Sequence, residues 1–209
     1  MCLFAYRLNE SNEGATERLW LYFPVGVKVF YLELRAFVDS ENVSSIVRSE
    51  IRWSLVKYDL ITRRIEQIQK ALSDYSTKNV DCTRLESILG IGPHISSAIV
   101  STIGKGQAFN NARDFAVWTG ITPIQKASGF KSVMSGITKR GDRYLGKLFV
   151  QAARHTAQWA KRNPETKLGQ WINQIIHRRG VQKSVVAIAY KLARISWISL
   201  NKEEKFKEE

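Results

Sequence analysis

The feature that most restricts the fold is a long run of apolar residues spaced by threes and fours. The run comprises Ile51, Leu55, Tyr58, Ile61, Ile65, Ile68 and Leu72. Such spacing places one apolar stripe along a helix and is typical of a coiled-coil seam. We therefore predict one long, coiled-coil-like helix over residues 45–80. Its stripe could pack within its own domain or against a second copy of the chain, and the spacing is compatible with both.

Residues 85–100 carry apolar residues on both sides of a Gly90-Ile91-Gly92 turn. This arrangement resembles a helix-hairpin-helix motif, in which glycines permit the tight turn and N–H groups that open the second helix bind phosphate. Pro93 suits an early position in that second helix. The same turn also occurs where two helices only pack together, so both interpretations stay open at this point.

Shorter helical patterns complete the prediction of a mostly α fold. Asn110-Asn111 can cap a short helix that ends at Gly120. A later amphipathic pattern predicts a helix from Leu168 that stops at Gly180, and a last helix follows from Ser184.

The segment from Arg143 to Arg162 predicts a helix with two contrasting faces, for which Asp142 is a good N-cap. At 100° per residue, its cations fall within a stripe about 40° wide, and apolar residues fill the opposite side. The cations are Arg143, Lys147, Arg154 and Lys161, and the opposite side carries Leu145, Leu148, Phe149, Ala152, Thr156 and Trp159. Because Asp142 is the only acid between Lys126 and Arg162, this charge favours an anionic partner over a merely solvated face.

The whole chain of 209 residues has a formal net charge of +13. Such an excess favours nucleic acid as the partner, with an anionic membrane surface as the lesser possibility. The apolar run over residues 184–200 is interrupted by Lys191 and Arg194, and the first residues hold no long apolar core. We therefore expect no membrane span and no signal peptide, and a cytoplasmic location.

Cysteine and histidine give no sign of a metal centre. These residues are Cys2, Cys82, His94, His155 and His177, and no spacing among them is typical of a zinc site. We interpret all of them as structural or incidental.

Between Gly120 and the Asp142 cap the sequence predicts a basic loop rich in Gly, Ser and Lys. Ser128 lies there between the small residues Ala127 and Gly129. The neighbouring cations are Lys126, Lys131, Lys139 and Arg140. Small neighbours allow a phosphate to approach the hydroxyl, and the cations would stabilise charge on a phosphoryl group under attack. Taken alone, the residues fit either a serine nucleophile or an ordinary flexible loop, and Ser132 and Ser135 are rivals.

Several motifs appear here in a fixed order: Gly-Ile-Thr-Pro at 120–123, Ser-Gly-x-Lys at 128–131, Gly-Ile-Thr-Lys-Arg-Gly-Asp-Arg-Tyr-Leu at 136–145, and Ala-Ala-Arg at 152–154. Together they resemble the C-terminal transposase domain of the insertion-sequence one-ten family, also called the one-sixteen and nine-oh-two family. The resemblance implies a DNA recombinase guided by a structured RNA, in which Ser128 attacks a DNA phosphodiester. It also implies that the long helix helps to assemble protomers, with residues 51–72 joining a homo-oligomer.

Nucleic-acid contacts are expected from Gly90, Gly92, Lys126, Lys131, Lys139, Arg140, Arg143, Lys147, Arg154 and Lys161. Two positions depart from the family pattern. Ala127 stands where many members have a second serine, which favours Ser128 as the nucleophile. Gly146 replaces a usual arginine, which predicts a helix with one fewer phosphate-binding cation.

Full members of the family begin with a RuvC-like domain whose acidic residues hold Mg²⁺. The acids before the long helix are Glu10, Glu13, Glu17, Glu33, Asp39 and Glu41, and they resemble no such site. We therefore expect an N-terminally truncated catalytic unit with no cofactor of its own, and Mg²⁺ only through a missing or partner acidic domain.

The predicted domains are an N-terminal remnant (1–44), the coiled-coil-like helix (45–80), the transposase domain (81–200) and a charged tail (201–209) that frays. Within the remnant, residues 25–37 fit either a helix or a pair of strands.

Two other functions fit parts of the sequence. The chain could be a non-catalytic DNA- or RNA-binding remnant that regulates the same element. Ser128 and Lys131 also fit the S-x-x-K signature of penicillin-recognising serine enzymes. Their partner motifs S-D-N and K-T-G do not occur in the sequence, so this third function is disfavoured.

Overall fold

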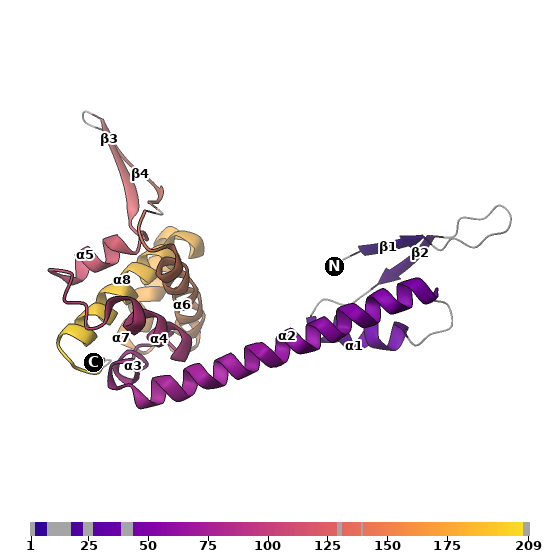
Figure 1. The fold of residues 1–209 in the computed structure, drawn as a ribbon. Helices are drawn as coiled ribbons and strands as arrows, with labels where there is room; N and C mark the ends of the chain where they lie inside the picture. Colours follow the sequence, from indigo (N-terminus) through magenta and orange to yellow (C-terminus); the bar gives the residue numbers. More distant parts are fainter. Residues whose placement is uncertain are drawn as a thin grey trace. The chain divides into compact units, whose positions relative to one another are not determined.

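The computed structural model describes residues 3–7, 18–22, 27–38, 44–128, 131–138 and 140–206, and for residues 3–28 and 123–136 it describes the backbone alone. These ranges contain β1 (Leu3–Arg7), β2 (Arg18–Tyr22), α1 (Val27–Val38), α2 (Ser45–Lys78), α3 (Val80–Leu85), α4 (Pro93–Ile103), α5 (Ala112–Trp118), β3 (Pro123–Ser128), β4 (Lys131–Ile137), α6 (Arg143–Arg162), α7 (Lys167–Arg179) and α8 (Val181–Asn201) (Figure 1). The predicted mostly α fold is confirmed. The chain divides into two units, Met1–Ile68 and Gln69–Glu209.

In the first unit, α1 packs against α2. The Tyr31 hydroxyl donates a hydrogen bond to the Asp59 carboxylate at 2.6 Å, which raises the pKa of Tyr31 because ionisation would break that bond. Arg35 forms an ion pair with the same carboxylate at 3.4 Å. The undecided segment 25–37 is thus a helix over the residues that the structure describes, while β1 and β2 form a separate antiparallel pair.

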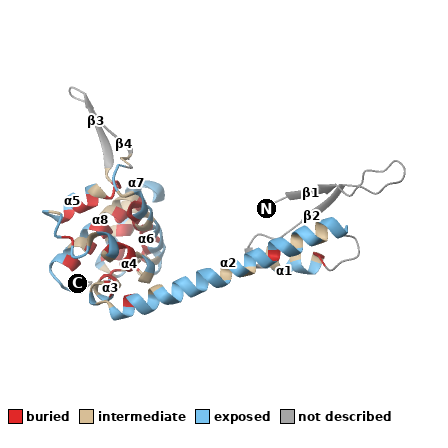
Figure 2. Cartoon of the chain, viewed as in Figure 1, coloured by how far each residue is buried: buried red, intermediate tan, exposed pale blue. Residues whose placement is uncertain are grey.

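The long helix predicted from the apolar spacing is confirmed as α2, which has 34 residues. Among the stripe residues, Leu55 is buried, whereas Ile61, Ile65 and Ile68 are each about half exposed. Figure 2 shows most of α2 in the colour of exposed residues. No described residue therefore covers most of this apolar stripe.

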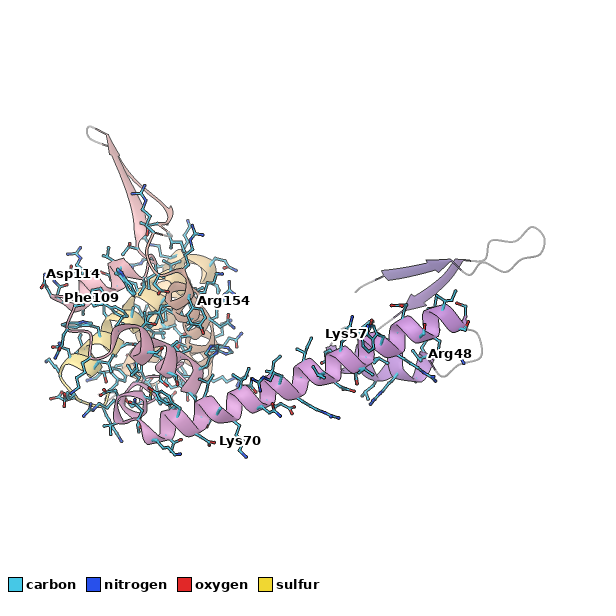
Figure 3. The ribbon with its side chains drawn as sticks, viewed as in Figure 1. Arg48, Lys57, Lys70, Phe109, Asp114 and Arg154 are labelled. Atoms are coloured by element: carbon cyan, nitrogen blue, oxygen red, sulfur yellow. The ribbon has the colours of Figure 1, made fainter. Side chains whose placement is uncertain are left out.

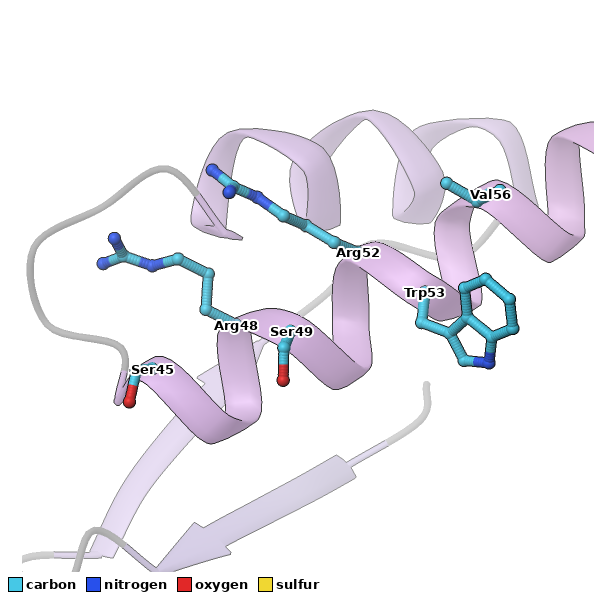
Figure 4. Close-up of a pocket in the computed structure, with 6 residues that line it drawn as sticks. All are labelled: Ser45, Arg48, Ser49, Arg52, Trp53 and Val56. Carbon is cyan, nitrogen blue, oxygen red and sulfur yellow. The ribbon is translucent and has the colours of Figure 1, made fainter.

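The start of α2 borders a shallow hollow of about 580 Å³ (Figure 4). Its lining residues are Ser45, Arg48, Ser49, Arg52, Trp53 and Val56. The ammonium group of Lys57 lies 5.1 Å from the centre of the Trp53 ring. This cation–aromatic contact holds an exposed tryptophan against its own helix.

The second unit is a helical domain whose core forms where α6 packs against α8. Both helices present small buried residues, which are Ala152, Ala153, Ala157 and Ala160 on α6 and Ala189, Ala193 and Ser196 on α8. Small side chains allow two helix backbones to approach closely. Larger buried residues such as Phe115, Phe149 and Ile172 fill the space around this contact. Figure 2 shows the buried residues gathered in this unit.

Side-chain caps fix the helix boundaries that the sequence predicted. The carboxylate of Asp142 accepts a hydrogen bond from the Leu145 N–H at 2.7 Å, and the Asn111 side chain caps α5. At Gly180, α7 ends as predicted. The last helix begins at Val181, three residues before the predicted Ser184.

The prediction of a loop between Gly120 and Asp142 was wrong, because these residues form an antiparallel hairpin of β3 and β4. Two hydrogen bonds close its base: the Thr138 N–H donates to the Thr122 carbonyl at 2.9 Å, and the Thr138 hydroxyl donates to the Gly120 carbonyl at 3.1 Å. Figure 1 shows the hairpin projecting away from the helices of its unit. Its strands pair with each other rather than with a larger sheet.

Residues 203 and 206 of the predicted charged tail contact the helical domain. Glu203 forms ion pairs with Lys105 and with Arg84, and the first of these lowers the pKa of Glu203. The Phe206 N–H donates to the Ser87 hydroxyl at 2.9 Å, and its ring packs partly against the core. Neither contact could be foreseen locally, because the partners lie about a hundred residues away.

None of the described helices is long and apolar enough to cross a membrane.

The turn between α3 and α4 is packed against α6. Gly90 has φ +87°, and a side chain there would overlap the Thr156 hydroxyl and approach the Ala152 carbonyl oxygen to 3.0 Å. Thr156 is fully buried and donates a hydrogen bond to the Leu89 carbonyl at 3.2 Å. At Gly92, by contrast, φ is −105° and a Cβ would meet nothing within 4 Å. The two glycines of the predicted motif therefore have different surroundings.

We predict that Gly90→Ala lowers the free energy of unfolding by about 2–4 kcal/mol, because it combines an unfavourable φ with overpacking. Gly92→Ala, the matched control two residues away, should lower this free energy by less, about 0.5–1 kcal/mol, because it meets no neighbour and only replaces a favourable N-cap residue. Urea unfolding followed by circular dichroism measures both. Equal losses in the two variants would contradict the packing described for Gly90.

Candidate nucleic-acid interface

The two-faced character predicted for α6 agrees with its burial pattern. Arg143, Lys147, Arg154 and Lys161 are all exposed, whereas Leu145, Phe149, Ala152 and Thr156 are buried. Leu148 and Trp159 are half-buried at the edges of the core face. We call the four exposed cations the α6 cation face. Arg154 is labelled in Figure 3.

No acid lies on α6, and the residues between its cations are neutral or basic. Within the described ranges, no carboxylate forms an ion pair with a member of the α6 cation face. Repulsion along the helix is therefore not relieved by a described acid, and an anion bound there would relieve it.

The structure brings the start of α4 next to the start of α6. His94 Nε2 lies 2.7 Å from the Tyr144 hydroxyl oxygen, although the two residues are 50 positions apart in the chain. Both side chains are exposed. Since Gly92 is the N-cap of α4 and Pro93 is its first residue, the predicted phosphate-binding turn is adjacent to Arg143. Two separate sequence motifs thus meet at one surface.

Sequence reasoning assigned no role to His94 or Tyr144. Nothing local links the two residues, because the contact exists only after α4 packs on α6. The one available signal was Tyr144 itself, a large aromatic residue on the polar side of α6 that is 53% exposed. Imidazole and phenol are both groups that can donate a hydrogen bond to a phosphate oxygen.

Gly146, which stands where the family pattern has an arginine, is not on the exposed face of α6. The residue is buried, and a Cβ there would lie 2.6 Å from the Thr119 carbonyl oxygen. A long side chain at this position would enter the contact between α6 and the end of α5. Glycine is required here by close approach, and the α6 cation face keeps all four of its members.

The predicted nucleophile, Ser128, is the last residue of β3, and its backbone position is paired in register with Lys131. Ser132 pairs with Ala127, one position further along the ladder. The side chains of Ser128, Lys126 and Lys131 and the whole of Lys139 lie outside the described residues. Arg140 is exposed where the chain returns from β4 to α6. Ser128 is the last residue of β3, and Figure 1 shows β3 and β4 projecting away from the helices of their unit, so the described backbone does not bring this position to the α6 cation face.

The described residues contain no group of three or more His, Cys, Asp and Glu side chains that could hold a metal ion. Cys82 is fully buried, and burial raises the pKa of its thiol because the thiolate would lose its hydration. The described part of this chain therefore offers no ligand set suited to Mg²⁺.

Comparison with known proteins identifies the segment that holds this surface. Residues 82–168 match the family model described as Transposase IS116/IS110/IS902 family. The chain carries a transposase domain of this family. The matched segment includes every residue predicted above to contact nucleic acid, from Gly90 to Lys161.

Two relatives illustrate the extent of the similarity. The chain is 31% identical over 202 residues to the transposase for insertion sequence element IS1111A of Coxiella burnetii, which covers 96% of this chain and 55% of the relative. It is 35% identical over 141 residues to the transposase for insertion sequence element IS1328 of Yersinia enterocolitica, which covers 68% of this chain and 42% of the relative. The chain thus spans about half the length, or less, of these relatives.

We predict that Lys147→Gln combined with Arg154→Gln weakens binding to duplex DNA of any sequence. The slope of log affinity against log salt concentration should fall by about 1 for each lost phosphate contact. The control is Lys57→Gln combined with Lys70→Gln, which removes the same charge from exposed positions of α2 (Figure 3). Fluorescence anisotropy with a short duplex over a salt series measures both slopes. Equal slopes in the two double variants would contradict a localised interface.

Proposed function

We propose that the chain acts in DNA transposition as part of an insertion-sequence transposase, and that its second unit binds DNA through the α6 cation face and the start of α4. One observation carries the proposal. Within a domain similar to those of insertion-sequence transposases, four exposed cations share one helix face that contains no acid.

The geometry of α6 suits the backbone of duplex DNA. At 1.5 Å per residue, the α6 cation face from Arg143 to Lys161 extends about 27 Å. This length exceeds the width of a major groove, about 12 Å, so one helix can contact phosphates on both sides of it. Contacts of lysine and arginine with phosphates position a protein without reading sequence. Sequence choice is then left to another part of the assembly, for which we propose the structured guide RNA.

For the chemical step we propose Ser128 as the nucleophile. Its hydroxyl oxygen would attack a DNA phosphorus atom and form a phosphoserine bond, while the bond to one bridging oxygen of the DNA breaks and the serine proton is transferred to a base or to water. The resemblance of the Ser-Gly-x-Lys motif supports this choice, as does the register that sets Lys131 opposite Ser128. A lysine close in sequence to the serine suits an attacked phosphate, because its positive charge would stabilise the charge that develops there.

The described residues hold no group of three or more His, Cys, Asp and Glu side chains that could bind Mg²⁺. We propose that an acidic domain outside this chain, or on a partner, completes the catalytic unit. In that arrangement the projecting hairpin presents Ser128 to a site built by another polypeptide segment.

A second candidate function is a DNA-binding regulator without catalysis. It is favoured by the projection of β3 and β4 away from the helices that carry the α6 cation face, because a nucleophile is usually flanked by the groups that bind its substrate. This alternative predicts normal DNA binding and no covalent chemistry.

We expect the wild-type chain, mixed with a protein that supplies the acidic Mg²⁺-binding domain, DNA with the ends of the element, the flanking transcript and Mg²⁺, to form a covalent protein–DNA adduct on a denaturing gel. Ser128→Ala should abolish the adduct, and Ser132→Ala, the control from the opposite strand, should preserve it. Loss of the adduct in Ser132→Ala alone would refute the assignment of Ser128. Absence of any adduct in the presence of the acidic domain, with intact DNA binding, would favour the regulator instead.

We also propose that the exposed stripe of α2 joins a second copy of the chain. Ile61→Gln combined with Ile65→Gln should raise the dissociation constant of a homo-oligomer at least about 100-fold, since each buried isoleucine contributes roughly 1.5–3 kcal/mol. Arg63→Gln combined with Lys70→Gln, on the other side of α2, should leave it unchanged. Analytical ultracentrifugation measures the dissociation constant, and a wild-type chain that is monomeric at every concentration would exclude this contact.

A further inference from the structure

A second cationic surface lies on α7 and α8, outside all the motifs discussed above. It surrounds a hollow of about 500 Å³ lined by Trp171, Lys183, Val186, Ala187, Tyr190, Lys191 and Arg194. Three of these seven residues are cations and two are large aromatics, and none is an acid. We call this surface the α7–α8 groove.

Each aromatic residue of the groove is paired with a cation. The Lys191 ammonium lies 4.0 Å from the centre of the Trp171 ring, and the Arg194 guanidinium lies 5.9 Å from the centre of the Tyr190 ring. Trp171, Tyr190 and Lys191 are half-buried, whereas Lys183 and Arg194 are exposed. The groove therefore places two aromatic rings beside three positively charged side chains.

Lys191 is held as a partly desolvated cation. Burial lowers its pKa, and no carboxylate among the described residues forms an ion pair with it. The sequence explains this lack of a counter-charge, because no Asp or Glu occurs from Thr166 to Lys202 whereas seven Lys and Arg do. An anion in the groove would supply the missing charge.

The two aromatic rings favour single-stranded over double-stranded nucleic acid as the anion. A duplex exposes phosphates but hides the faces of its bases, so the indole and phenol rings would gain little from it. A single strand exposes both, and proteins that bind single strands combine a positively charged groove with aromatic side chains on which bases stack. A hollow of about 500 Å³ lies in the range of sites that hold small molecules, so one nucleotide unit could enter it.

We propose that the α7–α8 groove binds single-stranded nucleic acid, with a base stacked on Trp171 and backbone phosphates at Lys183, Lys191 and Arg194. The Lys191 ammonium occupies one side of the indole in the free protein and turns toward a phosphate when a base takes its place. The α7–α8 groove shares no residue with the α6 cation face. The proposal for the groove therefore does not depend on the proposed transposase chemistry.

The test measures affinity for fluorescent 12-nucleotide strands of oligo-dT and oligo-U, and for a duplex of the same length. Trp171→Ala should weaken binding of single strands about tenfold or more, because stacking on an aromatic residue contributes about 1–3 kcal/mol per base. Lys191→Gln should lower the salt slope for single strands by about 0.7. Comparison of oligo-dT with oligo-U shows whether DNA or RNA is preferred.

Three controls separate stacking from charge and from folding. Trp171→Phe keeps an aromatic face and should retain most of the affinity. Arg154→Gln, on the α6 cation face, should weaken the duplex more than the single strand. A 12-unit abasic strand has the phosphates but no bases. Its affinity for the wild-type protein should be no higher than the affinity of oligo-dT for the Trp171→Ala variant. Thermal unfolding of each variant confirms that it is folded.

The proposal is overturned if Trp171→Ala folds and binds oligo-dT and oligo-U as tightly as the wild type. It is also overturned if the abasic strand binds as tightly as oligo-dT, since the groove would then be only a patch of positive charge. If Trp171→Ala fails to fold, two other variants test the proposal. An unchanged salt slope for single strands in Lys191→Gln, or a loss of most of the affinity in a folded Trp171→Phe, would then contradict it.

Discussion

The close contact between α6 and α8 is the interaction on which the second unit depends. Both helices bury small residues, including Ala157 and Ala160 on α6 and Ala189 and Ser196 on α8, all at or near complete burial. Because one face of α6 packs in the core, its opposite face is exposed to solvent. The position of the α6 cation face is therefore a consequence of core packing, and the charged surface is as rigid as the core that holds it.

The hairpin obeys a different constraint. Its strands pair with each other, and a hydrogen bond between Thr138 and Gly120 closes its base, where the chain leaves α5. An element attached at one end can carry a reactive residue away from the protein that folds it. The domain thus combines a rigid surface suited to holding DNA with a projecting element that carries the proposed nucleophile.

Helix positions could be predicted because their signals are local: Asp142 and Asn111 cap helices, and Gly180 stops one. The burial of α6 followed from its periodicity for the same reason. The hairpin was missed because Pro123 and Gly136 interrupt its strands, and a register shift near Gln125 obscures the alternation. Contacts such as that of His94 with Tyr144 depend on how helices pack, which no local pattern records. The need for glycine at position 146 could not be predicted either, because it depends on how close the Thr119 carbonyl lies in the folded domain.

The contact of Gly90 with Ala152 and Thr156 has a further consequence for binding. It joins the turn before α4 to the middle of α6 without an intervening flexible side chain. The donors at the start of α4 and the cations of α6 are therefore preorganised, and a bound strand does not have to order them relative to each other. Because the loss of conformational entropy on association is thereby reduced, a modest number of phosphate contacts can give useful affinity.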